Sequence, residues 1–230
     1  MKKIILFLLL MNIEGYAQVP EFIKTFDQGN PGAYLRNFTD LNGKTYFTVK
    51  GKELWATDGS VAGTDEIQVF DSDLVLMGRQ NNKIYYSRII DGSHGLIATD
   101  GTVGGAYTLK TNVAFEGDAI GISDKLFFKA KEDLTGKEWW VTDGTAAGTH
   151  IIKDINPGTS GQNESTAYMT HDDKLFFYGY TGSVHELWVS DGTEVGTYPL
   201  TSAGVSNSAL EGYDMIVYNN KLYFTFNDAV

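Results

Sequence analysis

The 230-residue sequence contains no cysteine and only 4 prolines. The absence of cysteine excludes disulfides, thiolate metal sites and a cysteine nucleophile. Long amphipathic helical stripes are also missing, and the apolar run Ile4–Met11 is too short to span a bilayer. A fold built from this chain must therefore be held together by apolar burial and by hydrogen bonds between strands.

The first residues have the features of a secretory signal peptide. Lys2 and Lys3 precede the apolar run, and Gly15-Tyr16-Ala17 resembles a small-residue cleavage site. We predict a signal peptide at residues 1–17 and a mature protein that begins at Gln18. The expected location is outside the cell or at the cell surface, with no membrane-spanning segment.

The net charge of −11 argues against nucleic acid and anionic membranes as partners. It is compatible with cations or neutral glycans. Hydrophobic residues make up 42% of the chain, and Tyr, Phe, Val, Ile and Thr recur in short alternating runs. This composition predicts an all-β protein.

One motif recurs four times along the chain. The copies are "ELWATDGSVAGT" (53–64), "GLIATDGTVGGA" (95–106), "EWWVTDGTAAGT" (138–149) and "ELWVSDGTEVGT" (186–197). Their aspartates lie 42, 43 and 48 positions apart, a period typical of a β-propeller with one blade per repeat.

A second signature recurs in the same period, as in "LNGKTYF" (41–47) and "NNKLYF" (219–224). Two turn-prone residues precede Lys and an aromatic strand, which predicts a type I′ hairpin. Each repeat then reads as four antiparallel strands, A to D, for example 118–122, 125–131, 137–143 and 149–155. We predict repeat units at approximately 33–70, 71–113, 114–156 and 157–202, with a partial unit at 203–230.

The Asp-Gly-Thr motif falls between strands C and D, where it predicts a structural hairpin turn. A calcium loop is the alternative, but such a loop needs several clustered oxygen ligands and each repeat supplies one aspartate. The turn residues are Asp58, Gly59, Gly63, Asp100, Gly101, Asp143, Gly144, Gly148, Asp191, Gly192 and Gly196.

The sequence resembles the secreted bacterial ELWxxDGT-repeat family, which pairs this hairpin with a "DINPG" strand exit. Residues 154–158 match that exit, whereas the second repeat departs from the family with Gly95-Leu96-Ile97 in place of Glu-Leu-Trp. The resemblance covers residues 22–226 and implies the propeller fold and export. Family members are typical of Bacteroidetes and often carry a type IX sorting domain.

The two ends of the chain each predict part of a blade. Residues 21–29 read as an unpaired strand D, and residues 214–230 read as an A–B hairpin without strands C and D. Propellers commonly close with one blade built from both termini, but a fragment of a larger propeller is the favoured interpretation. The sequence thus predicts about four complete blades and a partial fifth.

Carboxylates precede the innermost strand of most blades, in loops predicted to surround the channel mouth. Converging there, they could bind Ca²⁺ or a cationic ligand, or supply an acid–base group; the alternative is a set of solvated loops. The candidate acidic ring consists of Asp71, Asp73, Glu116, Asp118, Glu164, Glu211 and Asp214. His94 and His185 occupy the same position in two repeats. We interpret this position as solvated, because the other repeats have Lys52 and Lys137 there.

The candidate acids follow the repeat instead of breaking it, so no unique catalytic constellation stands out. This pattern favours a non-catalytic scaffold that binds a glycan or a protein through its mouth loops. A polysaccharide lyase or glycosidase that uses the acidic ring is one alternative. A passive spacer in a larger surface protein is another.

Overall fold

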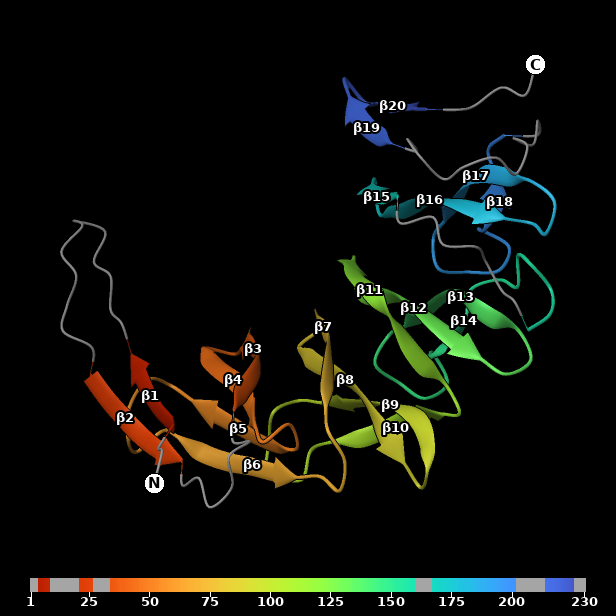
Figure 1. The fold of residues 1–230 in the computed structure, drawn as a ribbon. Coiled ribbons are helices and arrows are strands. Elements are labelled where there is room, and N and C mark those ends of the chain that lie inside the picture. Colours follow the sequence, from red (N-terminus) through yellow and green to blue (C-terminus); the bar gives the residue numbers. More distant parts are fainter. Residues whose placement is uncertain (1–3, 9–20, 27–33, 160–166, 202–213, 226–230) are drawn as a thin grey trace. The chain divides into compact units, whose positions relative to one another are not determined.

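The computed structural model describes residues 4–8, 21–26, 34–159, 167–201 and 214–225. All regular secondary structure in these segments is β-strand (Figure 1). Two compact units are present, residues 1–92 with 97–108, and residues 93–96 with 109–230. Within the described segments there is no helix long and apolar enough to cross a membrane.

Four antiparallel sheets of four strands each follow one another along the chain, and each strand pairs with its neighbour in sequence. Blade 1 consists of β3 (Leu35–Leu41), β4 (Lys44–Val49), β5 (Glu53–Thr57) and β6 (Asp65–Val69). Blade 2 consists of β7 (Val75–Gln80), β8 (Lys83–Ile90), β9 (Ser93–Thr99) and β10 (Tyr107–Thr111).

The later sheets repeat this order. Blade 3 consists of β11 (Ala114–Ile122), β12 (Lys125–Glu132), β13 (Gly136–Thr142) and β14 (His150–Ile151). Blade 4 consists of β15 (Tyr168–His171), β16 (Lys174–Tyr180), β17 (His185–Ser190) and β18 (Tyr198–Pro199). A partial blade holds β19 (Met215–Tyr218) and β20 (Lys221–Phe224). The chain is therefore an all-β protein of the propeller type.

The hairpin between the first two strands of each blade is set by residues that accept positive φ. Asn81 and Asn82 have φ angles of 49° and 56°, and Asp172 and Asp173 have 46° and 57°. Positive φ at both central residues is the requirement of the type I′ turn, whose twist matches that of the strands. The turn chemistry thus fixes the register of those A–B pairs in which both central residues have a positive φ.

The paired aromatics of strand B point to opposite faces of a blade. Tyr46 is buried in a cluster with Ile84 and Tyr86 of blade 2, and its hydroxyl lies 3.3 Å from the carbonyl oxygen of Gly101. The next residue, Phe47, contacts the ring of Phe26 on the other face. Blades 1 and 2 therefore pack face to face, and blade 1 contributes apolar side chains to packing on both of its faces.

The segment predicted to be an unpaired strand D has a partner in the structure. β2 (Glu21–Phe26) pairs antiparallel with β1 (Ile4–Leu8). Phe26 packs edge-on against Trp55 of blade 1 at 5.0 Å between ring centroids. The expectation of an unpaired strand was wrong for the chain as described, because the backbone of Ile4–Leu8 satisfies one edge of β2.

Strand D of blade 3 is shorter than residues 149–155, the range expected from sequence. The β14 ladder ends at Ile151, although the amide of Ile152 still donates to the carbonyl oxygen of Trp139 at 2.9 Å. Beyond that point the amide of Asn156 donates to the Glu138 carboxylate at 3.2 Å. A side chain therefore replaces the backbone ladder where the chain turns away toward Pro157.

Candidate functional site

The Asp-Gly-Thr motif forms a closed hydrogen-bonded turn between strands C and D. In blade 1, Asp58 Oδ1 accepts from the Ser60 amide at 2.9 Å and from the Ser60 hydroxyl at 2.7 Å. The Ser60 hydroxyl also accepts from the Gly63 amide at 2.9 Å. These bonds lower the pKa of Asp58, mainly through the Ser60 hydroxyl. The aspartate oxygens thus serve the turn itself.

The same turn recurs in the other three blades. Asp100, Asp143 and Asp191 each accept from the amide and hydroxyl of the threonine two residues later. The threonine hydroxyls lower the pKa of Asp100 and of Asp191. Within the described residues, no group of three or more His, Asp or Glu side chains is arranged to hold a metal ion. The geometry therefore supports a structural turn.

The two glycines of the motif have different roles. The first, such as Gly192 with a φ of 88°, adopts the left-handed conformation that other residues avoid. The second, such as Gly148, has no side chain because a Cβ atom would collide with the carboxylate of Asp143. The close approach of the aspartate side chain therefore explains the second glycine.

Grooves separate the C–D turns of neighbouring blades. A groove of 440 Å³ lies between Lys44 of blade 1 and the Asp100–Val103 turn of blade 2. Its counterpart of 220 Å³ in the second unit lies between Lys125 and the turn residues Gly192, Thr193 and Glu194. Because the grooves recur with the repeat, they follow from the stacking of equivalent turns.

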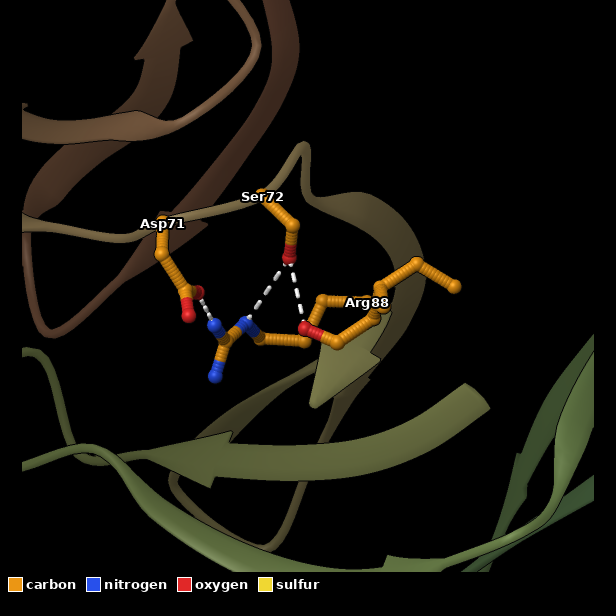
Figure 2. A network of polar contacts seen from close by, with 4 residues as sticks. Asp71, Ser72 and Arg88 are labelled. Atoms are coloured by element: carbon orange, nitrogen blue, oxygen red, sulfur yellow. Dashed lines mark hydrogen bonds and ion pairs between the residues drawn. The ribbon is translucent and has the colours of Figure 1, made fainter. Parts of the chain in front are cut away.

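The candidate acid Asp71 forms an ion pair with Arg88 on strand B of its own blade (Figure 2). Ser72 fixes the cation, because its hydroxyl accepts from Arg88 Nε at 3.3 Å and donates to the Ile89 carbonyl oxygen at 2.7 Å. Arg88 also lies over the ring of Phe70 at 5.3 Å. The negative charge of Asp71 is therefore compensated within the blade.

Asp118 in blade 3 has an equivalent partner. Its Oδ2 accepts from Lys129 Nζ at 3.0 Å, and this lysine is buried between the rings of Trp139 and Tyr168. The Asp118 carboxylate offsets the desolvation cost of burying the Lys129 cation, and the aromatic faces add cation–π attraction. Asp118 and Lys129 thus join the inner strand of blade 3 to that of blade 4.

The remaining ring candidates also have local surroundings. Asp73 lies against the B–C turn, where a Cβ on Gly51 would come within 2.8 Å of its carboxyl group. Asp214 Oδ1 accepts from the amide of Met215 at 2.8 Å. Glu164 and Glu211 fall outside the described residues. Each described member thus has its own local contacts, and among the described residues these acids form no group of three that could hold a metal ion.

One cavity does lie on the rim expected to bind ligands. Its volume is 380 Å³, and it is bounded by the B–C loops of blades 2 and 3 and by the loop that enters β11. The lining residues are Ser93, His94, Asn112, Ala114, Glu116, Lys131 and Asp133. Glu116 is the only member of the acidic ring among them, and its Oε2 lies 3.9 Å from Lys137 Nζ.

His94 and His185, which occupy equivalent positions in blades 2 and 4, have different environments. His94 is exposed and lines the cavity. His185 is buried beside Tyr180, with 4.8 Å between the ring centroids, and burial lowers its pKa. The expectation of a solvated position was therefore wrong for His185, because the B–C connection of blade 4 folds this ring into the protein.

The sequence pattern does not single out Lys131, Asp133, Asn112 and Ser93 as cavity residues. Each lies at a strand end or in a loop, and none belongs to a repeated motif. Their membership in the B–C and D–A loops was the available signal. Their convergence depends on how the start of β9 and Asn112 lie against β11 and the end of β12 within the second unit.

No family model matches the chain, and no curated protein matches it. Solved structures similar to it include an oligogalacturonate lyase in complex with manganese, at 13% identity and a TM-score of 0.49, covering 86% of this chain and 59% of that chain. TolB from Acinetobacter baumannii is similar at 13% identity and a TM-score of 0.35, covering 81% of this chain and 47% of that chain. The chain thus spans about three fifths and one half of these two proteins.

Proposed function

We propose that this protein is an exported, non-catalytic binding scaffold that recognises a glycan or a protein at or outside the cell surface. The proposal rests on the 380 Å³ cavity in the B–C and D–A loops. Its lining comes from strand ends and adjoining loops that differ between blades, whereas the opposite rim carries the same turn in every complete blade. A ligand site on a repeat scaffold is expected where the repeat varies.

The chemistry of the lining suits a polyhydroxyl ligand. Lys131 and His94 supply donors, Glu116 and Asp133 supply acceptors, and the Asn112 amide supplies both. Sugar hydroxyl groups donate and accept hydrogen bonds, so a neutral glycan matches a lining of mixed polarity. The net charge of −11 disfavours polyanionic ligands. We therefore favour a glycan over a protein ligand.

A lyase or glycosidase is the alternative function. Such an enzyme needs a carboxyl group held close to a second catalytic group at the reacting bond. Asp71 and Asp118 each contact a cation of their own blade, and Glu116 lies near Lys137. These pairings favour a binding role over catalysis, because the carboxylates already take part in intramolecular contacts.

Calorimetric titration with neutral oligosaccharides tests the proposal, using cello-, malto-, xylo- and mannohexaose as probes. We expect at least one to bind, and the Glu116→Gln/Asp133→Asn variant to bind it at least about tenfold more weakly, because each charged carboxylate becomes a neutral amide in which a donor NH2 replaces one acceptor oxygen. Asp124→Asn, an exposed substitution on the opposite rim, is the matched control.

Two outcomes would support other functions. Release of new reducing ends or unsaturated products, lost in a Glu116→Gln/Asp118→Asn variant that still folds, would establish an enzyme. A protein that binds none of the sugars and no surface protein would be a spacer.

Export has its own test. We expect amino-terminal sequencing of protein secreted by a bacterial host to begin at Gln18. Cleavage there removes β1 and leaves one edge of β2 without its partner strand. Retention of Met1 in the secreted protein would contradict the proposed signal peptide.

A further inference from the structure

The apolar segment of the predicted signal peptide is a strand in this structure. β1 (Ile4–Leu8) runs antiparallel to β2, and its register extends from Ile4 opposite Phe26 to Leu8 opposite Glu21 (Figure 1). This strand lies within the apolar run that marks a signal peptide. The part of the leader that an export factor would bind is therefore already paired within the chain.

The partner strand, β2, is held by contacts with blade 1. Ile23 and Phe26 are buried, and the Phe26 ring packs edge-on against Trp55. Lys24 Nζ donates to the carbonyl oxygen of Thr64 at 3.0 Å and lies 4.5 Å from the centroid of the Trp55 ring. Two strands alone are only marginally stable in water, so the pairing of β1 with β2 depends on these contacts.

The predicted cleavage site lies in the segment that joins the two strands. Ala17 and Gln18 fall between the end of β1 at Leu8 and the start of β2 at Glu21. Leu8 and Glu21 are register partners, so the two ends of this segment are held side by side. A peptidase that binds the apolar run must first separate β1 from β2. The rate of cleavage then follows the population of the opened state.

We propose that the folded chain masks its own leader, because β2 holds β1 once blade 1 has formed and so inhibits the removal of residues 1–17 by a signal peptidase. This inference rests on the proposed signal peptide and adds the condition that the leader is removed before the first blade folds. The reaction is hydrolysis of the peptide bond between Ala17 and Gln18, in which water supplies the new carboxylate and the new amino terminus. The pairing of β1 with β2 is thus an autoinhibitory contact.

Cleavage of the same precursor in two states tests the inference. Full-length protein in urea is either diluted directly into a purified bacterial signal peptidase, or refolded first and then mixed with the peptidase at the same final urea concentration. We expect the refolded precursor to lose its leader at least about tenfold more slowly, because cleavage must wait for local opening. Mass spectrometry of the products gives the rate and identifies the cleaved bond.

A pair of variants separates the docking of β2 from general stability. Phe26→Ala removes the ring that packs against Phe47 and Trp55, and leaves the leader unchanged. After refolding, this variant should be cleaved at least about tenfold faster than the refolded unmodified precursor, since β2 opens more readily. Phe177→Ala, which truncates a buried phenylalanine of blade 4, is the matched control and should leave cleavage slow. Circular dichroism first establishes that both variants fold.

Hydrogen exchange tests the pairing without a peptidase. The full-length chain is compared with a chain that begins at Gln18, and exchange is followed in the peptide that contains β2. We expect the amides of β2 to exchange at least about tenfold more slowly in the full-length chain, because β1 satisfies one edge of this strand.

Three results would count against the inference. A refolded precursor that is cleaved as fast as the directly diluted one, with equal exchange of β2 in the two chains, would mean that the leader is not masked, while the signal peptide itself would stand. Equal cleavage rates for Phe26→Ala and Phe177→Ala would mean that the contact of β2 with blade 1 does not control cleavage. A precursor that is cleaved in neither state would overturn the proposed signal peptide and this inference with it.

Discussion

Lys153 Nζ lies 2.9 Å from the carbonyl oxygen of Thr197, and this bond ties the end of blade 3 to the C–D turn of blade 4. Lys24 makes the same bond to Thr64 at 3.0 Å and lies 4.5 Å from the centroid of the Trp55 ring. A lysine that follows strand D, or lies within it, thus reaches across to the turn of the next blade.

The pairing of a strand D lysine with a tryptophan of the next blade recurs along the sequence. Lys110 lies 5.9 Å from the ring centroid of Trp140, the tryptophan of the next "EWW" strand. Between blades 1 and 2, Gln68 stands at the position equivalent to Lys110, and Ile97 stands at the position equivalent to Trp140. The two positions change together, because a cation gains less when no aromatic face lies beside it.

We expect Lys153→Met to destabilise the protein by about 1 kcal/mol, because the Thr197 carbonyl loses its donor while the apolar stem is retained. Urea unfolding measures the change. Lys174→Met, an exposed lysine of the same unit, should leave the midpoint almost unchanged. Equal effects of the two substitutions would argue against a stabilising role of the hydrogen bond from Lys153 to Thr197.

Gly148→Ala should destabilise the protein by about 1–3 kcal/mol, because the added methyl group meets the Asp143 carboxylate. In an Asp143→Ala background the same substitution should cost much less, since the obstructing carboxylate is gone. Thermal unfolding of the four proteins in this cycle measures the coupling. An additive cycle would mean that Gly148 is needed for another reason.

His185 should make stability depend on pH. Burial lowers its folded-state pKa below the ordinary value of 6.5, so the unfolded chain binds the proton more readily. The contribution is fully present above pH 6.5 and is lost as the pH falls toward the folded-state pKa. Urea unfolding across this range should show a shallower loss for His185→Phe, whereas His94→Phe, at an exposed site, should follow the unmodified protein.

Asp191 should act at lower pH. Hydrogen bonds led by the Thr193 hydroxyl lower its pKa, so its stabilising effect is present above pH 3.8 and is lost as the pH falls through the folded-state pKa. Asp191→Asn keeps the acceptor oxygen and should cost less than about 1 kcal/mol near neutral pH. Its acid unfolding should be less steep than that of Glu194→Gln, made in the same turn. Identical acid transitions would contradict this role.

Most of the strand order could be predicted from local sequence. The pairs Asn81-Asn82 and Asp172-Asp173 specify hairpins through their own φ preferences, and the Asp-Gly-Thr turn closes on bonds between residues two to four apart. The period of the motif then places the blades in order. The expectations that failed, an unpaired β2 and a solvated His185, both depend on residues far away in the chain or on burial.

The sequence by itself determined the turns, the strand pairs within a blade and the presence of two opposite aromatic faces, because these depend on contacts between near neighbours. The tertiary structure decided which carboxylates contact cations, which loop residues line the cavity, and which aromatic faces remain exposed. Arg88 meets Asp71, and Tyr168 covers Trp139 while Phe38 stays half exposed, only after distant strands pack. Those relationships depend on the packing of whole blades, for which a single repeat contains no signal.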